Sequence, residues 1–219
     1  MQRAHQGFSD RTQAGAALGL ALATELPAGE YVVLGLLRGG VPIAAEVAHA
    51  LGAALGALAV RKLGAPSNPE LALGALAQYR GEEDRVLNAE LYRRASRSFG
   101  LDSLEDTETA ARQKLSALSD QFADYAPELT DRIVVLCDDG LATGATMKAG
   151  LALVRKFQPA MLIAAVPVAA PTELDELSRY ADRSFALIRP QEFNAVGAYY
   201  EDFTQVTEQR VHQLLRAAG

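Results

Sequence analysis

Two adjacent carboxylates precede a turn rich in glycine and threonine in the stretch VVLCDDGLATGAT, residues 134–146. Thr143 to Thr146 open a predicted helix, and the first N–H groups of a helix are unpaired and lie at the positive end of its dipole. Such a terminus suits phosphate, because glycine lets the anion approach the backbone and threonine adds hydroxyl donors. Asp138 and Asp139 would repel a phosphate and suit sugar hydroxyls or a metal ion instead. The segment therefore predicts a site for a sugar phosphate.

A second glycine-bearing turn follows another apolar run, in the stretch LLRGGVP at 36–42. Gly39 and Gly40 allow a tight turn that directs backbone N–H groups at an anion. Arg38 adds a permanent positive charge and a planar fork that fits phosphate oxygens. The alternative is an ordinary turn between a strand and a helix. Together with the first turn, an anion site is the favoured interpretation.

Arg61 and Lys62 stand side by side near the end of a further predicted strand. Their two positive charges could neutralise a pyrophosphate group at the same edge of the sheet. A solvated pair of charges is the plainer interpretation, because charged residues are common at exposed positions. Both interpretations stay open at this point.

These turns need buried strands and following helices to hold them in place. Apolar runs without charges predict strands that are buried on both faces, as in parallel sheets. Strands are predicted at 31–37, 55–63, 133–137, 161–168 and 184–188, with a weaker strand at 71–79 after a loop at 64–70, and a hairpin partner at 86–87. Helices are predicted from Ser9 or Asp10 to 25, and at 42–51, 102–126, 144–157 and 171–180. The alternation predicts an α/β fold with a mainly parallel sheet, whose strand ends carry the ligand.

The longest predicted helix, at 102–126, begins at a sequence that is similar to a capping box, with Asp102 followed by Glu105 three residues later. An apolar stripe at helical spacing runs along it, formed by Leu104, Ala111, Leu115, Leu118, Phe122 and Tyr125. If exposed, the stripe could serve a homodimer. Packing on the chain's own sheet is the simpler arrangement.

Composition places the chain among ordinary globular proteins. It has 219 residues, a formal net charge of −6, 49% apolar residues and 22% charged residues. The single Cys137 excludes an internal disulfide framework and a multi-cysteine zinc site. No apolar run reaches the roughly 20 residues of a membrane helix, and residues 1–15 are too polar for a secretory signal. We expect a cytoplasmic protein without membrane contact, and the net acidity argues against a nucleic-acid partner.

The residues of the two turns resemble a known family. The order of apolar strand, two acids and Thr-Gly-x-Thr turn is similar to the phosphoribosyl pyrophosphate signature of type I phosphoribosyltransferases. The chain closely resembles a bacterial branch described as predicted phosphoribosyltransferases. The resemblance extends over most of the chain, including RGGVPIAAEVA, RKLGAPSNPELALGA and GAYYEDF. It implies a doubly wound, mainly parallel sheet with a small hood or lid region.

The resemblance also implies a role for each part of the two turns. Asp138 and Asp139 would hold the 2′- and 3′-hydroxyls of ribose, and residues 142–146 its 5′-phosphate. Ala142 departs from the commonest signature, which has threonine there, so one side-chain donor is lost. The turn at Arg38 would bind pyrophosphate and carry a cis peptide bond before that arginine, and Mg²⁺ would bridge pyrophosphate and ribose. The implied catalytic residues are Asp138, Asp139 and Arg38, both aspartates being candidate Mg²⁺ ligands, and the implied substrate-binding residues are Leu37, Gly39, Gly40, Arg61, Lys62, Gly140, Leu141, Ala142, Thr143, Gly144, Ala145 and Thr146.

The expected organisation is a single phosphoribosyltransferase-like domain over residues 1–219 with two additions. A hairpin insertion at about 64–90 falls where the resemblance implies a mobile lid, and a static hairpin fits the sequence equally. A C-terminal segment at about 189–219 is rich in aromatic residues, on which an acceptor base could stack. Packing of most of these rings onto the sheet is favoured. The aromatic residues are Phe193, Tyr199, Tyr200 and Phe203.

The resulting prediction is an enzyme of nucleotide metabolism. It would transfer the 5-phosphoribosyl group from phosphoribosyl pyrophosphate to a nitrogenous acceptor, with a nucleobase favoured, and release pyrophosphate. Two alternatives stay open: a regulatory module that binds the same ligand or a nucleotide without turnover, and a sugar-phosphate hydrolase or phosphorylase. The motifs of dinucleotide-binding folds, Walker NTPases, serine hydrolases and zincins are absent from the sequence.

Overall fold

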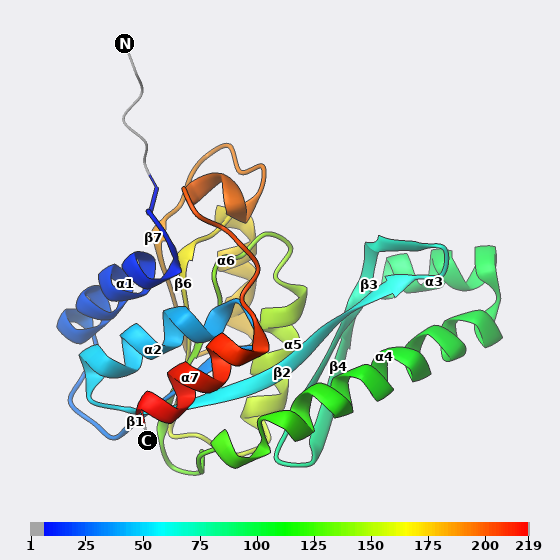
Figure 1. Cartoon of the computed structure of the whole chain (residues 1–219). Helices are drawn as coiled ribbons and strands as arrows, with labels where there is room; N and C mark the ends of the chain where they lie inside the picture. The colour runs from blue at the N-terminus through cyan, green and yellow to red at the C-terminus, as the bar shows by residue number, and fades with distance from the viewer. Residues whose placement is uncertain (1–6, 219) are drawn as a thin grey trace.

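The computed structural model describes residues 7–218, and seven strands form one mixed sheet at its centre (Figure 1). Their order across the sheet is β4-β3-β2-β1-β5-β6-β7. Five neighbouring strands, β2, β1, β5, β6 and β7, run parallel to one another. The hairpin strands β3 and β4 extend the sheet beyond β2 with antiparallel pairing. This confirms the predicted α/β class with a mainly parallel sheet. The strands are β1 (Tyr31–Leu36), β2 (Ala54–Ala65), β3 (Asn68–Tyr79), β4 (Glu82–Leu87), β5 (Ile133–Cys137), β6 (Met161–Val168) and β7 (Arg183–Ile188).

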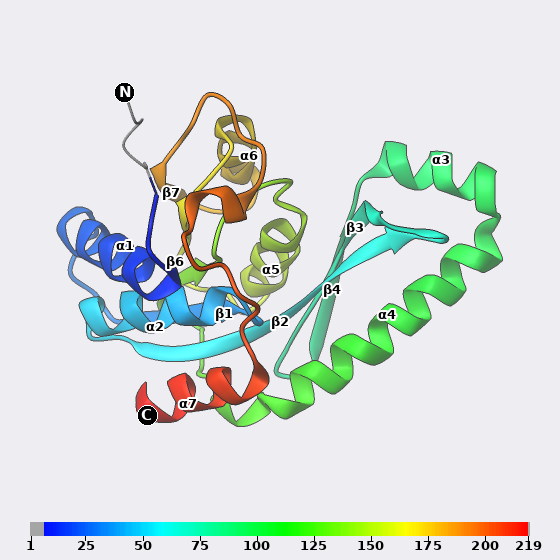
Figure 2. The same cartoon turned by 45° about the horizontal axis from the view of Figure 1, so that its top comes forward.

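Helices cover both faces of the sheet, so it is doubly wound. α1, α2 and α7 pack on one face, and α5 and α6 pack on the other (Figures 1 and 2). The helices in the described part of the chain are α1 (Arg11–Glu25), α2 (Gly40–Leu51), α3 (Ala89–Phe99), α4 (Leu101–Gln121), α5 (Ala145–Arg155), α6 (Pro171–Glu176) and α7 (Glu208–Ala218), with 3-10 turns η1 (Ala123–Tyr125), η2 (Leu177–Arg179) and η3 (Val196–Tyr199). None of these helices is long and apolar enough to cross a membrane.

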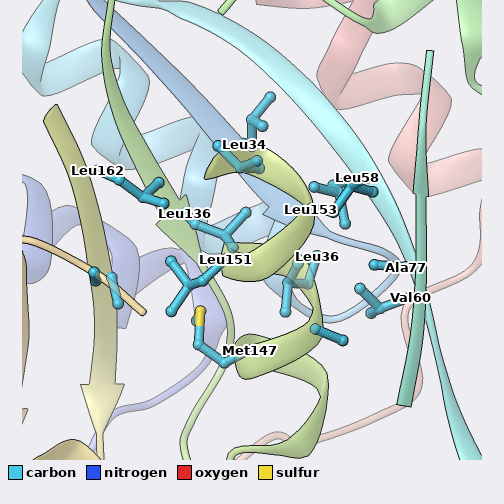
Figure 3. Close-up of a cluster of buried hydrophobic side chains, with 14 of the residues drawn as sticks. Leu34, Leu36, Leu58, Val60, Ala77, Leu136, Met147, Leu151, Leu153 and Leu162 are labelled. Atoms are coloured by element: carbon cyan, nitrogen blue, oxygen red, sulfur yellow. The ribbon is translucent and has the colours of Figure 1, made fainter. Parts of the chain in front are cut away.

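The core lies on both sides of the parallel strands. Leu34 and Leu136 pack under α5 against Leu151 (Figure 3), and their neighbours Val33 and Val135 face α1 and α2. Because successive side chains of a strand point to opposite faces, a strand between two helix layers needs apolar residues throughout. Burial of each leucine contributes about 1.5–3 kcal/mol. These strands hold the turns at their carboxyl ends in fixed positions.

An arm projects from the body of the molecule (Figures 1 and 2). We use this name for the outer part of the β2–β3 hairpin, α3 and the first half of α4. β2 and β3 have 12 residues each, whereas β1 has 6, so the hairpin runs on beyond the parallel strands. The arm has a small cluster of buried side chains of its own, formed by Ala65, Leu73, Ala95 and Leu104.

The predicted loop at 64–70 is wrong. β2 continues to Ala65 and β3 already begins at Asn68, so only two residues form the turn. The hairpin accommodates this glycine- and proline-bearing stretch through register shifts at Gly64 and Ala65. The hairpin between the weaker strand and its partner is confirmed by the pairing of β3 with β4.

The predicted capping box at Asp102 is also wrong. α3 runs to Phe99, and Gly100, with a φ of 80°, turns the chain directly into α4. Asp102 therefore lies inside the first turn of α4, and Gly100 at the N-cap provides no side-chain hydrogen bond. α3 and α7 had no predicted counterpart in the sequence. The first six residues of the polar N-terminal stretch lie outside the described part of the chain.

The apolar stripe of α4 packs inside the chain. Leu115 and Phe122 are buried against β2 and α7, and Leu104 is buried in the cluster of the arm. This confirms the simpler of the two arrangements considered for the stripe, packing within the chain.

Candidate active site

A cavity of about 800 Å³ opens at the carboxyl ends of β1 and β5 and beside Val60, Arg61 and Lys62 in β2, before that strand continues into the arm. Both turns singled out in the sequence line it, so the fold brings together residues that are far apart in the chain. The predicted residues that line the cavity are Leu37, Arg38, Gly39, Arg61, Lys62, Asp138, Asp139, Gly140, Leu141, Ala142, Thr143, Gly144 and Thr146. Gly40 and Ala145, which were also predicted, are not among the lining residues.

The two turns pack so closely that glycine is required where they meet. A Cβ atom on Gly39 would lie 2.4 Å from Oδ2 of Asp139, and one on Gly40 would lie 2.4 Å from the carbonyl oxygen of Cys137. Real Cβ atoms do not approach other atoms so closely, so a larger residue at Gly40 would push the turns apart and one at Gly39 would displace the carboxylate of Asp139. The peptide bond between Leu37 and Arg38 is cis, as the family resemblance implied.

The turn after β5 leads into the N-terminus of α5. Gly144 is the N-cap residue and adopts a left-handed conformation with a φ of 67°. Leu141 anchors the turn, because its N–H donates to Val168 and its carbonyl accepts from Ala170. The first N–H groups of α5 have no partner inside the helix. Thr143, Gly144 and Thr146 of this helix start line the cavity.

The two carboxylates share a buried and crowded position. Burial and the neighbouring carboxylate of Asp139 raise the pKa of Asp138 well above its usual range. Burial also raises the pKa of Asp139, and the positive charges of Arg11 and Lys62 oppose that rise. An acid pair in such surroundings favours a cation or neutral hydroxyls as its neighbour.

Arg11, at the start of α1, is a site residue that the sequence analysis missed. Its Nε and Nη2 donate to Oδ2 of Asp139 at 2.9 and 2.8 Å, and its Nη1 donates to the carbonyl of Thr204 at 2.8 Å. The guanidinium carbon lies 3.9 Å from the centre of the Phe203 ring. Arg11 therefore joins one carboxylate of the pair to the C-terminal segment. No local signal marks it, since an arginine in the first turn of a helix looks like an ordinary surface residue.

The aromatic segment packs against the chain itself. The hydroxyl of Tyr200 donates to the carbonyl of Asp139 at 2.6 Å, and its ring stacks on Phe203 at 5.1 Å. Phe193 and Tyr199 stack on each other at 5.8 Å. Phe203 contacts both Arg11 and Tyr200, and it remains 37% exposed and lines the cavity. This matches the favoured interpretation that most of these rings serve packing.

Besides Arg11 of α1, the cationic residues that line the cavity come from β2, from the turn after β1 and from α4. Arg61 and Lys62 are successive residues of β2, so their side chains leave opposite faces of the strand. Lys62 acts on the acid pair, because its positive charge opposes the rise that burial causes in the pKa of both aspartates. Arg38 lies 3.6 Å from Glu208 of α7. Lys114 lines the cavity from α4 and was missed, since its helix lies far from the two turns in the sequence.

The donor set of the cavity fits Mg²⁺ held mainly by a substrate. Mg²⁺ prefers oxygen ligands, keeps several waters and is often bound through one or two carboxylates plus substrate phosphates. Asp138 and Asp139 offer such carboxylates, with Oδ2 of Asp139 already bound by Arg11. In the described part of the chain, no group of three or more His, Cys, Asp and Glu side chains could hold a metal ion.

Comparison with known proteins defines the class. A profile of the family described as "Phosphoribosyl transferase domain" matches residues 14–203. The chain belongs to the phosphoribosyltransferase family, in its type I branch.

Particular relatives agree with this assignment. Two Mycobacterium tuberculosis proteins, from strains CDC 1551 and H37Rv, are named "Putative phosphoribosyl transferase MT0597" and "Putative phosphoribosyl transferase Rv0571c". Each is 40% identical over 213 residues, which is 96% of this chain and 47% of the relative. The chain thus spans about half the length of the curated relatives it matches.

Solved structures also resemble this chain. The protein TT1426 from Thermus thermophilus is 43% identical with a TM-score of 0.76, over 95% of this chain and 97% of that one. The AQ2163 protein from Aquifex aeolicus is 18% identical with a TM-score of 0.50, over 85% and 78% of the two chains, and shows a shared fold.

Proposed function

We propose that this chain binds phosphoribosyl pyrophosphate and transfers its 5-phosphoribosyl group to a nitrogenous acceptor, with a nucleobase as the expected acceptor. The observation that carries the proposal is that one cavity holds an acid pair, the N-terminus of α5 and a basic glycine turn. A ligand with two hydroxyls between a phosphate and a pyrophosphate satisfies all three groups. Membership of the phosphoribosyltransferase family supports the same reaction.

In this proposal each turn binds one part of the substrate. Asp138 and Asp139 bind the ribose hydroxyls, and residues 142–146 bind the 5′-phosphate through backbone N–H groups and the threonine hydroxyls. The turn at 37–40 binds pyrophosphate. Arg61 and Lys62 add positive charge there from either face of β2.

Mg²⁺ fits the proposal as a bound partner of the substrate, with Asp138 and Asp139 as the protein groups that would hold it. When bound, the ion would neutralise negative charge on the pyrophosphate. Arg11 restricts this role for Asp139, because it already binds one oxygen of that carboxylate.

The reaction replaces one bond at C1 of ribose by another. The bond from C1 to the pyrophosphate oxygen breaks, and its electron pair leaves with pyrophosphate. The lone pair of the acceptor nitrogen forms the new bond to C1. Arg38, Arg61 and Lys62 stabilise the departing negative charge, and the carboxylates favour positive charge on the sugar. The chain contributes fixed charges that need no rearrangement during the reaction.

The proposal also includes the organisation of the chain and its cellular compartment. We propose one catalytic unit of nucleotide metabolism in the cytoplasm, since a single buried cysteine requires no oxidising compartment.

The hairpin insertion does not serve as a wall of the cavity, because none of the lining residues falls between 64 and 90. A lid role for it would require movement of the hairpin toward the cavity.

Pyrophosphate release tests the proposed reaction. The protein is incubated with phosphoribosyl pyrophosphate, Mg²⁺ and the common purine and pyrimidine bases in turn. We expect release that depends on one of these acceptors, and its loss in the double variant Asp138→Asn, Asp139→Asn. The matched control is Asp182→Asn, an aspartate that pairs with Arg155 and does not line the cavity.

The other outcomes identify the competing functions. Release without any acceptor would favour a hydrolase, and tight binding without release for every base would favour a regulatory module. Unchanged kinetics in the folded double variant would contradict the roles proposed for the two aspartates.

A further inference from the structure

Glu208 places a further carboxylate in the cavity, besides those of the acid pair. It is the first residue of α7, and this helix begins at a cap, because the N–H of Arg210 donates to the hydroxyl of Thr207 at 3.1 Å. A negative charge in the first turn suits the positive end of the helix dipole. The reaction proposed above gives this carboxylate no part in binding.

Packing holds Glu208 close to the turn that is proposed to bind pyrophosphate. Val211, one helical turn further along α7, is buried in the same apolar cluster as Leu37 and Val41, which flank that turn. Oε1 of Glu208 lies 3.6 Å from Nη1 of Arg38, and both side chains line the cavity. The side chain of Arg38 is 31% exposed and that of Glu208 is 50% exposed, so a ligand in the cavity can reach the pair.

Arg38 differs in this respect from the other cationic residues that are proposed to meet pyrophosphate. Arg61 and Lys62 also line the cavity, and neither forms an ion pair with any side chain that the structure describes. The carboxylate beside Arg38 offsets part of its positive charge and repels an anion that approaches it. Glu208 therefore acts against the binding of a phosphate group at this turn.

On the basis of the proposed function, we infer that Glu208 is a displaceable counter-ion of Arg38, which competes with pyrophosphate and speeds its release. The pair is long and partly exposed, and such pairs contribute little to stability. Two phosphate oxygens can meet both prongs of the guanidinium, so pyrophosphate displaces the carboxylate when it binds. The carboxylate returns to Arg38 as pyrophosphate leaves. Product release limits the turnover of many enzymes, so a competitor at this position favours turnover.

The effect is confined to one end of the substrate. In the proposed function, ribose 5-phosphate is held by Asp138, Asp139 and residues 142–146, whereas Glu208 contacts the turn at the pyrophosphate end. Loss of the Glu208 charge should therefore strengthen the binding of pyrophosphate and leave the binding of ribose 5-phosphate unchanged.

Calorimetry with two probe ligands tests the inference. Inorganic pyrophosphate and ribose 5-phosphate are each titrated, with Mg²⁺ present, into the full chain and into Glu208→Gln. We expect the variant to bind inorganic pyrophosphate at least about threefold more tightly, and ribose 5-phosphate with unchanged affinity. Damage to the fold would not produce a gain for one ligand alone. Glu201→Gln is the control, because it removes the same charge from an exposed position of the same C-terminal segment that does not line the cavity.

A second background tests whether Glu208 acts through Arg38. In Arg38→Met, the further change Glu208→Gln should alter the affinity for pyrophosphate by less than about twofold, because no guanidinium remains to compete for. A gain that persists in full in this background overturns the competition for Arg38.

The remaining outcomes separate this inference from the proposed function. Pyrophosphate binding that Glu208→Gln leaves unchanged or weakens overturns the role of Glu208, and the proposed reaction stands. Failure of the unaltered chain to bind pyrophosphate contradicts the proposed function, and the role of Glu208 falls with it.

Discussion

Arg11 makes the two carboxylates of the acid pair unequal. Asp139 receives two hydrogen bonds from the guanidinium, which is itself held by the carbonyl of Thr204 and the ring of Phe203. Asp138 accepts a hydrogen bond from the N–H of Asp139 and has no ion pair among the described residues. Asp138 is therefore the carboxylate with more freedom to meet a ligand, and Arg11 fixes the orientation of the other.

Substitution of Arg11 tests this difference. Arg11→Met leaves Asp139 without its partner in a largely buried position, and breaking such a pair is costly. We expect the affinity for phosphoribosyl pyrophosphate, measured by calorimetry, to fall about tenfold or more. Arg11→Lys should recover part of the loss, since it keeps the charge but not the fork. Arg155→Met removes a more exposed Arg–Asp pair that lies away from the cavity, and it is the control. Equal losses for Arg11→Met and Arg155→Met would contradict the positioning role.

Cys137 offers a second test at this scale. The thiol is fully buried in β5, and burial raises its pKa, so the reactive thiolate is not formed at neutral pH. We expect no reaction with a thiol reagent such as dithionitrobenzoate while the protein is folded. In denaturant, one thiol per chain should react. Rapid labelling of the folded protein would show that β5 opens and that the turn after it is not held firmly.

Some residues of the candidate site could be predicted from the sequence, and others could not. Asp138, Asp139 and Arg38 could be selected because they follow buried strands and lead into turns that contain glycine, so the local pattern carries the signal. Arg11 could not, because its partner Asp139 lies 128 residues away and only the folded chain joins them. The opposite directions of Arg61 and Lys62 follow from strand geometry alone.

At the scale of elements, the buried strands were predictable and the arm was not. A strand between two helix layers must be apolar on both faces, so β1, β5 and β6 stand out in the sequence. Ala95 is the only buried residue of α3, so the helix is held in place by tertiary contacts rather than by a broad apolar stripe. The corner at Gly100 depends on its positive φ, and the sequence around it resembled a helix start at Asp102 instead.

Two helix starts provide a matched comparison. Asp10 caps α1, since its side chain accepts a hydrogen bond from the N–H of Gln13 at 2.8 Å. Asp102 was predicted to cap α4 but lies inside its first turn. Urea denaturation should show that Asp10→Ala lowers the free energy of unfolding by about 1 kcal/mol. Asp102→Ala should change it by less than about 0.5 kcal/mol. A loss for Asp102→Ala as large as for Asp10→Ala would contradict this account of the two starts.

At the scale of the whole molecule, the cavity belongs to the body, and the arm projects away from it (Figure 2). The parallel sheet places two turns at one edge, and close packing at Gly39 and Gly40 makes them a single site. The C-terminal segment closes one side of that site through Tyr200 and Phe203, and α4 contributes Lys114 from another side. The sequence predicted the sheet and its edge, whereas the cavity required elements from both ends of the chain.

The central claim is that this cavity binds phosphoribosyl pyrophosphate, and a calorimetric titration with and without Mg²⁺ tests it most directly. We predict saturable binding that Mg²⁺ strengthens, and its loss in the folded variant Asp138→Asn, Asp139→Asn. Absence of binding at millimolar ligand, or binding that the double variant retains unchanged, would contradict the account.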